Sequence, residues 1–222
     1  MKRRIFGFYF LHGLALLGLT PSSFATSARP GVRAVYGVSD KKPPFDTFLI
    51  DQIPPWLLQH GINAVFLPAS ASTAMLQALR QAEIRCFLEV PVFSSRSHYR
   101  AHPEWRPITA SGEEMKPDGW YHGLCPNQPA LRELRLKELE KRLRYSLFDG
   151  YWLDFIRYPV HWEKKNPRIE DSCFCPECLR RFKAFASLDL PSATPAAATQ
   201  ILERHLPAWV RFRIHTIASW VA

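Results

Sequence analysis

The chain has 222 residues, a length that allows one domain with a sizeable core and scarcely allows two. Its formal net charge is +9. The basic residues are spread over segments such as 132–144, where they alternate with Glu133, Glu138 and Glu140, as on a solvated helix face. This distribution argues against a nucleic-acid-binding groove, so no nucleic acid is expected as a partner.

The first residues have the pattern of a cleavable export signal. Basic residues at 2–4 precede an apolar stretch over 5–19, and small residues within 23–25 fit cleavage by a signal peptidase. The apolar stretch is shorter than the ~20 residues that cross a bilayer, so we expect no stable membrane span. The sequence therefore predicts a signal peptide over 1–25 and an exported protein, periplasmic or extracellular.

Runs of β-type residues alternate with helical patterns along the chain. The first helical pattern stops at Gly61, which suits a C-terminal helix cap. Residues 92–119, with His, Pro, Gly and Ser, are too long for an ordinary connection, and such loops are usually functional. The β-type runs cover 33–38, 63–67, 85–90, 120–125 and 149–155, and the helical patterns cover 45–60, 72–82, a segment that starts at Asn127, and a segment from about 196 to the end with a join near Pro207.

This alternation predicts a parallel α/β sheet, because parallel neighbours need crossover connections that cover both sheet faces. A barrel and a doubly wound sheet both fit, but no glycine-rich phosphate loop follows the first strand, which favours a (β/α)8-type (TIM) barrel. A complete barrel has eight strands in about 250 residues. Five predicted strands therefore indicate that the domain over 26–222 is C-terminally truncated and lacks its last three units.

The fifth β-type run holds the best candidate for a catalytic residue. Side chains alternate along a strand, so Asp154 lies on the face opposite to the apolar Tyr151 and Leu153. We expect Asp154 to point into the barrel near the C-terminal end of its strand, where such barrels assemble their active sites. Arg157 and Tyr158 follow in the loop and can hold this carboxylate or a substrate hydroxyl. The alternative is an aspartate that only ties down its own loop through Arg157.

Four segments carry a family resemblance. They are His102–Trp105, Gly123–Asn127, Asp149–Pro159 and Cys173–Cys178. Together they resemble a bacterial family of hypothetical glycoside hydrolase-like proteins with a (β/α) barrel, over a region from about residue 33 to the C-terminus. In these proteins the aspartate at the position of Asp154 is taken as the catalytic or substrate-binding acid, and the resemblance implies that role here.

Glycoside hydrolysis normally needs a second carboxyl group about 5 to 9.5 Å from the first. The candidates are Glu89 at the end of the third β-type run, Asp40 after the first run, and a residue on the missing strands. Chitinase-like barrels place a glutamate two residues beyond the aspartate, where this chain has Ile156. A chitinase mechanism is therefore disfavoured.

Aromatic side chains near the strand ends are candidate platforms for sugar rings, whose flat C–H faces rest on aromatic rings while their hydroxyls need polar partners. The alternative is that these rings fill core space and that the histidine is structural. The candidate substrate-binding residues are Arg157, Tyr158, His122, Trp105, Trp120 and Trp162.

Cys173, Cys175 and Cys178 form a compact thiol cluster that can supply three tetrahedral zinc ligands, with Cys125 as the fourth. Some β-galactosidases with related barrels are similar in holding a structural zinc in this way. Disulfide pairing is the alternative, because an exported protein permits it. Five cysteines cannot all pair, and Cys86 in a β-type run looks like a buried free thiol, so four ligands and one remaining thiol are consistent with zinc.

The sequence thus predicts an exported glycoside hydrolase that acts on a poly- or oligosaccharide through strand-end carboxylates and requires no cofactor for catalysis. The alternative is a non-catalytic carbohydrate-binding module or an inactive truncated barrel. A zinc hydrolase with the cysteines at the reaction centre is disfavoured, because all-thiolate clusters leave no open position for water.

Overall fold

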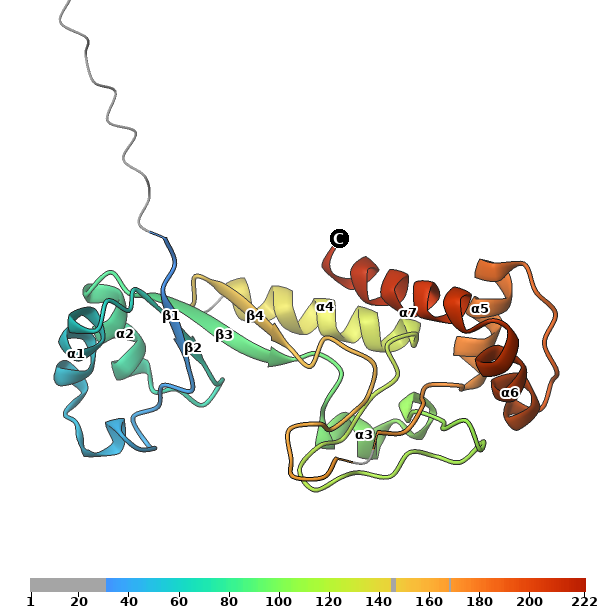
Figure 1. Cartoon of the computed structure of the whole chain (residues 1–222). Helices are drawn as coiled ribbons and strands as arrows, with labels where there is room; N and C mark the ends of the chain where they lie inside the picture. Colours follow the sequence, from blue (N-terminus) through green and yellow to red (C-terminus); the bar gives the residue numbers. More distant parts are fainter. Residues whose placement is uncertain (1–30, 145–146, 168) are drawn as a thin grey trace, which may run out of the picture. The chain divides into compact units, whose positions relative to one another are not determined.

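The computed structural model describes residues 31–222 apart from 145, 146 and 168. The predicted signal peptide over 1–25 lies outside the described residues. The described residues form a mixed α/β fold around a four-stranded parallel sheet with the order β1-β2-β3-β4 (Figure 1). The strands are β1 (Ala34–Tyr36), β2 (Ala64–Leu67), β3 (Arg85–Pro91) and β4 (Gly150–Asp154). The predicted parallel α/β sheet is therefore confirmed.

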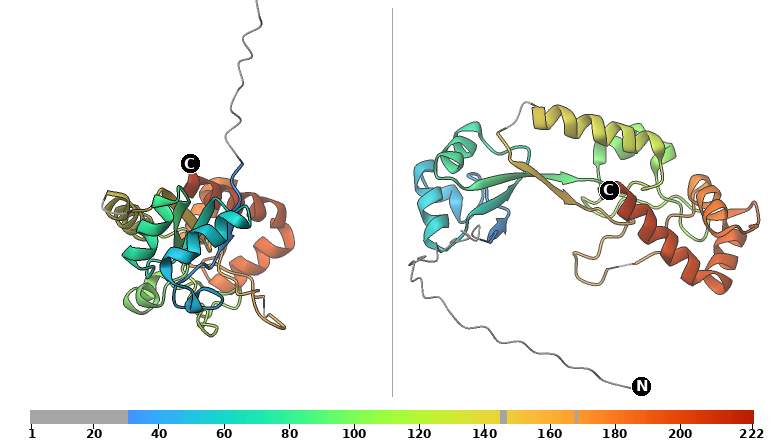
Figure 2. Two further views of the ribbon diagram at one scale, coloured as in Figure 1. Left: turned by 90° about the vertical axis from the view of Figure 1, so that its left-hand side faces the viewer. Right: turned by 90° about the horizontal axis from the view of Figure 1, so that it is seen from above.

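Helices connect these strands and extend beyond the last one, as two further views show (Figure 2). The α-helices are α1 (Ile53–Gln59), α2 (Thr73–Gln81), α3 (Arg96–Ala101), α4 (Pro129–Arg144), α5 (Pro176–Ala186), α6 (Thr194–Arg204) and α7 (Leu206–Val221). Short 3-10 turns form η1 (Phe45–Thr47), η2 (Ile50–Gln52) and η3 (Pro103–Trp105).

Local sequence signals explain where several helices begin and end. The predicted helix over 45–60 is regular only from Ile53, because the chain before it forms two 3-10 turns. Gly61 follows this helix with a φ of +73°, a conformation that glycine adopts without a steric penalty. Ser72 caps α2, since its hydroxyl accepts a hydrogen bond from the Met75 amide at 3.2 Å. Pro207 lies in the first turn of α7, so the predicted join there is correct.

The predicted strand over 120–125 is wrong, and the described residues form a sheet of four strands where five were expected. The segment forms only isolated bridges, such as the one between Gly123 and Ser94. Its amides bond to different parts of the chain: Leu124 donates to the Phe93 carbonyl and Cys125 to the Trp105 carbonyl. No single neighbouring strand therefore runs beside it among the described residues. The long segment over 92–119, expected as a loop, also contains α3 and η3.

One face of the sheet is covered by helices. Val65, Leu67 and Cys86 on this face are buried with residues of α1 and α2 in one hydrophobic cluster. Helix α4 lies beside β4 in Figures 1 and 2, and the Tyr151 hydroxyl donates to the Leu139 carbonyl of that helix. The alternation predicted for β4, with Tyr151 facing a helix, is thus confirmed.

A second hydrophobic cluster joins α5, α6 and α7 to the four clustered cysteines. Its centre is Trp209 of α7, which is 1% exposed and stacks on the ring of Phe174. A third cluster, with Phe93 and Leu124 at its centre, reaches Trp220 near the end of α7. No helix in the described part of the chain combines the length and the apolar character that crossing a membrane requires.

Candidate active site

The second face of the sheet carries the two best carboxylates. Register pairs Tyr36 with Phe66, and Glu89 with Trp152, on neighbouring strands. Because side chains alternate along a strand, these residues and Asp154 all project from the same face. Tyr36 is 56% exposed and Trp152 is 41% exposed, so this face is open to solvent in the described residues. Trp152 therefore lies at the surface beside both carboxylates.

Each carboxylate has one oxygen held in place. The Tyr36 hydroxyl donates to Glu89 Oε1 at 2.7 Å, and the Phe155 amide donates to Asp154 Oδ1 at 2.7 Å. Burial, the hydrogen bond to Glu89 and the charges of Glu89 and Asp154 together raise the pKa of Tyr36. Both carboxylates therefore act electrostatically on the same hydroxyl.

The sheet register sets the spacing between these two acids. Pro91 pairs with Asp154, so Asp154 lies two residues beyond the partner of Glu89 on the adjacent strand. Standard strand spacing and rise put the two Cα atoms about 8 Å apart. Both side chains project from the same face, so this Cα spacing is compatible with the carboxyl separation of about 5 to 9.5 Å that glycosidase pairs have.

Asp40, the other predicted candidate for the second acid, lies in a different environment. Its Oδ2 accepts a hydrogen bond from the Ser72 hydroxyl at 2.7 Å, which links the loop after β1 to the start of α2. Its Oδ1 is buried and has no hydrogen-bond partner among the described residues. No contact in the described part of the chain joins Asp40 to Asp154, so the geometry brings Glu89, and not Asp40, to Asp154.

Arg157 lies in the loop after β4 and pairs with Glu163. Its guanidinium also lies over the rings of Phe155 and Trp162, at 4.8 and 4.0 Å from their centroids. Among the described residues it makes no ion pair with Asp154, so the alternative in which Arg157 ties down Asp154 has no such contact to support it. Trp162 remains 51% exposed.

An aromatic cluster lies directly beyond Asp154. The rings of Trp120, Tyr121 and His161 pack together, and both Trp120 and Tyr121 contact Phe155 at 5.5 and 5.6 Å between centroids. Trp120 is 59% exposed, whereas Tyr121 is buried, and burial raises the pKa of Tyr121 to about 12. The predicted platform residue Trp120 thus lies at the surface near the strand end.

Three predicted substrate-binding residues are buried instead. Trp105 stacks on His102 at 3.6 Å, and His122 contacts the Trp120 carbonyl at 2.9 Å through Nδ1. Tyr158 is buried in the same cluster as the cysteines, where its hydroxyl accepts a hydrogen bond from Asn127 Nδ2 at 2.8 Å. These side chains support the loops around the site and offer little surface to a sugar.

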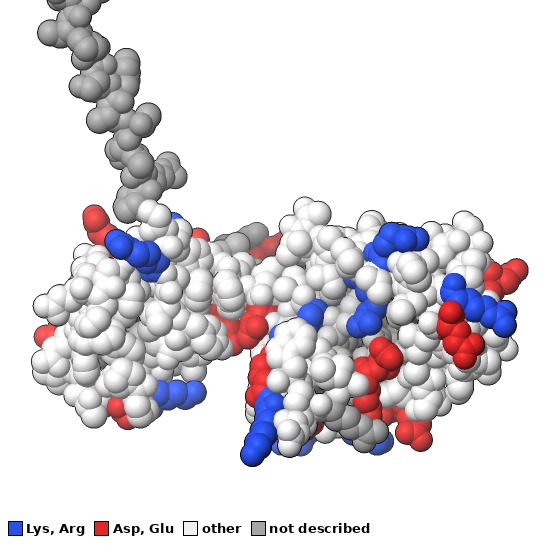
Figure 3. Space-filling model, viewed as in Figure 1, with Lys and Arg blue, Asp and Glu red and all other residues white. Residues whose placement is uncertain are grey.

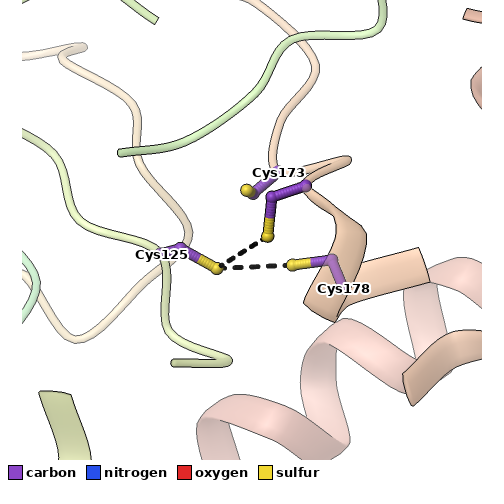
Figure 4. A group of neighbouring side chains, drawn as sticks. Cys125, Cys173 and Cys178 are labelled. Atoms are coloured by element: carbon purple, nitrogen blue, oxygen red, sulfur yellow. Dashed lines mark hydrogen bonds between the residues drawn. The ribbon is translucent and has the colours of Figure 1, made fainter. Parts of the chain in front are cut away.

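The four clustered cysteines lie close together, as predicted. Cys125, Cys173, Cys175 and Cys178 are buried, and their sulfur atoms all lie within 4.8 Å of one another. Figure 4 shows the sulfur atoms of Cys125 and Cys178 directed toward each other, with Cys173 beside them. Every cysteine in the described residues is a free thiol, including the separate Cys86.

This sulfur arrangement fits a tetrahedral zinc ion. Zinc–thiolate bonds of about 2.3 Å give sulfur–sulfur edges of about 3.8 Å in a tetrahedron. The Cys125 sulfur lies 3.6 Å from that of Cys175 and 3.4 Å from that of Cys178. Burial raises the pKa of Cys125 and Cys178, whereas hydrogen bonds from the neighbouring thiols lower the pKa of Cys175. A bound cation would stabilise all four as thiolates.

The loops that carry the two sites are packed tightly against each other. A Cβ atom at Gly123 would lie 2.6 Å from Pro159 Cβ, so only glycine permits this approach. The Asn127 amide donates to Cys178 Sγ at 3.2 Å as well as to Tyr158. The thiol cluster thus anchors the loop that begins at Asp154.

Solved structures of three glycoside hydrolases match part of this chain. The β-galactosidase of the haloarchaeon Halorubrum lacusprofundi has a TM-score of 0.55 at 13% identity, over 85% of this chain and 33% of that enzyme. The β-galactosidase of Bacillus circulans sp. alkalophilus has a TM-score of 0.51 at 14% identity, over 84% and 33%. These matches show a shared fold. The α-L-fucosidase isoenzyme 2 of Paenibacillus thiaminolyticus has a TM-score of 0.48 at 17% identity, over 85% and 30%.

The chain therefore spans about a third of the length of these enzymes. No family model matches the sequence, and no curated protein matches it.

On the face drawn in Figure 3, basic and acidic side chains are interspersed and do not gather into one basic patch.

Sequence patterns did not identify Tyr36 as a residue of the candidate site. They also did not predict that Trp152 is exposed. The signal for Tyr36 was available, because it occupies an alternate position in a β-type run that precedes the run of Glu89 in a parallel sheet.

Proposed function

We propose that the protein is an exported glycoside hydrolase that acts on a poly- or oligosaccharide, with Glu89 and Asp154 as its carboxyl pair. The single observation that carries this proposal is their position on one open sheet face at the ends of adjacent strands. The likeness of the fold to part of two β-galactosidases supports the same class of reaction. The export signal remains part of the proposal.

The arrangement suits the chemistry of glycosidic bond cleavage. One carboxyl group donates a proton to the leaving oxygen, while the other acts on the anomeric carbon or on a water molecule. The Tyr36 hydroxyl holds Glu89 Oε1, and the Phe155 amide holds Asp154 Oδ1. Each acid therefore keeps its second oxygen for the substrate. The exposed ring of Trp152 lies next to both acids and can carry the C–H face of a sugar.

The proposal includes a (β/α)8-type barrel and a structural zinc. Four parallel strands in sequential order are the arrangement with which such a barrel begins. The four buried thiols would hold zinc with no position left for water, so the metal would brace the loop after Asp154 and take no part in bond cleavage.

The test is hydrolysis of a panel of polysaccharides and aryl glycosides by the purified chain and its variants. Asp154→Asn and Glu89→Gln are each expected to lower kcat about 10² to 10⁴-fold, because each removes an acid–base or nucleophilic group. The matched control is Asp189→Asn, whose side chain is fully exposed and far from the sheet in sequence. If the folded Asp154→Asn variant hydrolyses the substrate as fast as the parent, the assignment of Asp154 is wrong.

The second candidate is a carbohydrate-binding module without turnover, which the open face with Tyr36 and Trp152 exposed favours. It predicts that a glycan binds and is not cleaved. Trp152→Ala should then abolish retention of the protein in glycan-containing native gels, while Asp154→Asn should leave retention unchanged.

A further inference from the structure

A polar pocket lies at the C-terminal ends of β2 and β3, next to α3 and α4. Its volume is about 540 Å³, within the range of about 300 to 1,000 Å³ typical of small-molecule sites. Glu89, one of the two proposed catalytic acids, forms part of its wall. The rest of the lining comes from residues 68–70, 90–91, 94–95 and 97–98 and from one side of α4. The pocket therefore adjoins the proposed active site.

The charged side chains of the lining balance one another. Two arginines, Arg135 and Arg142, stand beside two carboxylates, Glu89 and Glu138. Arg135 pairs with Glu138 at 2.7 Å, and the His98 ring lies 3.3 Å from the same carboxylate. Burial and the charge of Arg135 lower the pKa of His98, so this ring is neutral at pH 7. The lining thus has a formal charge of zero and offers no excess counter-charge to an ionic ligand.

A nearly buried hydroxyl in the lining lacks a partner. Ser94 is 7% exposed, and its side chain makes no hydrogen bond among the described residues. Its Oγ keeps some contact with solvent, because it is not one of the described side-chain atoms that are both fully buried and unbonded. Polar groups in such positions are normally hydrogen-bonded, so the partner of this hydroxyl has to come from within the pocket.

The free polar groups of the lining are a mixture of donors and acceptors. Hydroxyls of Ser70, Ser94 and Ser97 can do both. The second oxygen of Glu89 accepts, and Arg142, which makes no ion pair among the described residues, donates. Sugar hydroxyls donate, accept and carry no charge, so they suit all of these groups. We infer that this pocket binds a neutral sugar residue of the glycan, and that the protein therefore prefers uncharged glycans to those built from uronic acids or amino sugars.

The order of the strands puts this pocket next to the bond to be cleaved. Strand β3 lies between β2 and β4. Trp152 of β4 pairs in register with Glu89, and the pocket lies on the other side of Glu89, beyond the end of β2. A glycan that rests on Trp152 and crosses Glu89 can thus place its next sugar against Ser94. The inference rests on the proposed function for its glycan, but its test measures binding separately from hydrolysis.

The experiment is calorimetric titration of the protein with neutral tetramers of β-1,4-linked glucose, galactose, mannose or xylose, beside tetramers of galacturonic acid and of glucosamine. At least one neutral tetramer should bind at least about tenfold more tightly than either charged tetramer, because a charge without a counter-charge in the pocket is costly. The affinity of this neutral tetramer should stay the same at high salt, since salt screens only interactions between charges.

Two lining variants separate hydrogen bonding from charge. Ser94→Ala should weaken binding of the best neutral tetramer about twofold to tenfold, because it removes one hydrogen bond to the ligand. It removes no side-chain hydrogen bond within the described residues, so the melting temperature should stay unchanged. Arg142→Gln should change this affinity less than about twofold, because glutamine still donates and no ion pair is lost. The ring signals of His98, identified by their loss in His98→Gln, should shift during a nuclear magnetic resonance titration with the same tetramer.

The matched control is Ser192→Ala, an exposed serine outside the pocket, which should leave the affinity unchanged. Failure of every neutral tetramer to bind, or tighter binding of a charged one, would overturn the inference. So would an affinity that Ser94→Ala does not change, or a large loss in Arg142→Gln, which would indicate an anionic ligand. Neutral binding that depends on Ser94, without hydrolysis of any glycan, supports the pocket and removes the glycosidase. Hydrolysis of a glycan whose binding Ser94→Ala does not change supports the glycosidase and removes the pocket.

Discussion

Removal of the proposed zinc ion from the thiol cluster is the perturbation with the largest expected effect. Sulfur–sulfur distances of 3.4 and 3.6 Å from Cys125 are close to the about 3.8 Å edges of a zinc–thiolate tetrahedron, so little rearrangement is needed for binding. Structural zinc sites contribute about 10 to 16 kcal/mol in small domains, as much as the whole stability of a typical domain.

The loss of stability should be concentrated in one part of the fold. The cysteines share their hydrophobic cluster with α5, α6 and α7, and Trp209 lies at its centre. If the loss of metal lowers the free energy of unfolding by about 5 kcal/mol, the melting temperature should fall by about 10 to 20 °C. The conversion is about 2 to 4 °C per kcal/mol for a chain of this size. Far-ultraviolet circular dichroism should show the accompanying loss of helix.

The assay combines metal analysis with thermal unfolding. The purified protein should contain one zinc per chain, and a strong chelator should remove it and lower the melting temperature. Cys178→Ser should lower the zinc content, whereas Cys86→Ser should retain it, because Cys86 is a buried thiol in the sheet and outside the cluster. A metal-free protein that melts at the same temperature with or without chelator, or fewer than five titratable thiols after denaturation, would refute the reasoning.

Two further predictions concern stability. Trp209→Ala should cost about 3 to 5 kcal/mol in the free energy of unfolding, measured in urea, because this ring is 1% exposed and packs against three phenylalanine rings; a cost below 1 kcal/mol would contradict the packing. Burial and the neighbouring Arg135 lower the pKa of His98 below 6.5, so the unfolded chain takes up this proton first and stability should fall as pH drops below about 6.5. His98→Gln should flatten this dependence in melts between pH 5 and 7, and an unchanged slope would exclude His98 as its source.

The strands that sequence patterns predicted correctly are those with one face packed against helices. The runs of β1, β2, β3 and β4 are apolar because one face packs against α1, α2 or α4. The run over 120–125 contains similar residues, yet Leu124 and Cys125 are buried by loops and by the thiol cluster. Burial by a loop and burial in a sheet select the same side chains, so hydrophobicity alone could not distinguish them.

The alternation of side chains along the strands predicts which sheet face each site residue occupies, and the sequence predicts the site to that extent. Alternation places Asp154 on the face opposite to Tyr151, and the parallel register brings Glu89 to the same face. Burial of Trp105 and Tyr158 depends on the path of the loops, which no local pattern contains. Exposure of Trp152 depends on what covers the second face of the sheet, and this too is not a property of its own strand.

The thiol cluster and the carboxylates are coupled through one loop. Tyr158 is held by Asn127, which also donates to Cys178, and Pro159 packs against Gly123. Arg157 lies between this anchor and the strand end. Loss of metal would therefore release the loop from its far end, while β4 keeps Asp154 in place through its pairing with β3. A metal-free protein that stays folded should thus lose substrate affinity while Asp154, the proposed catalytic acid, keeps its position.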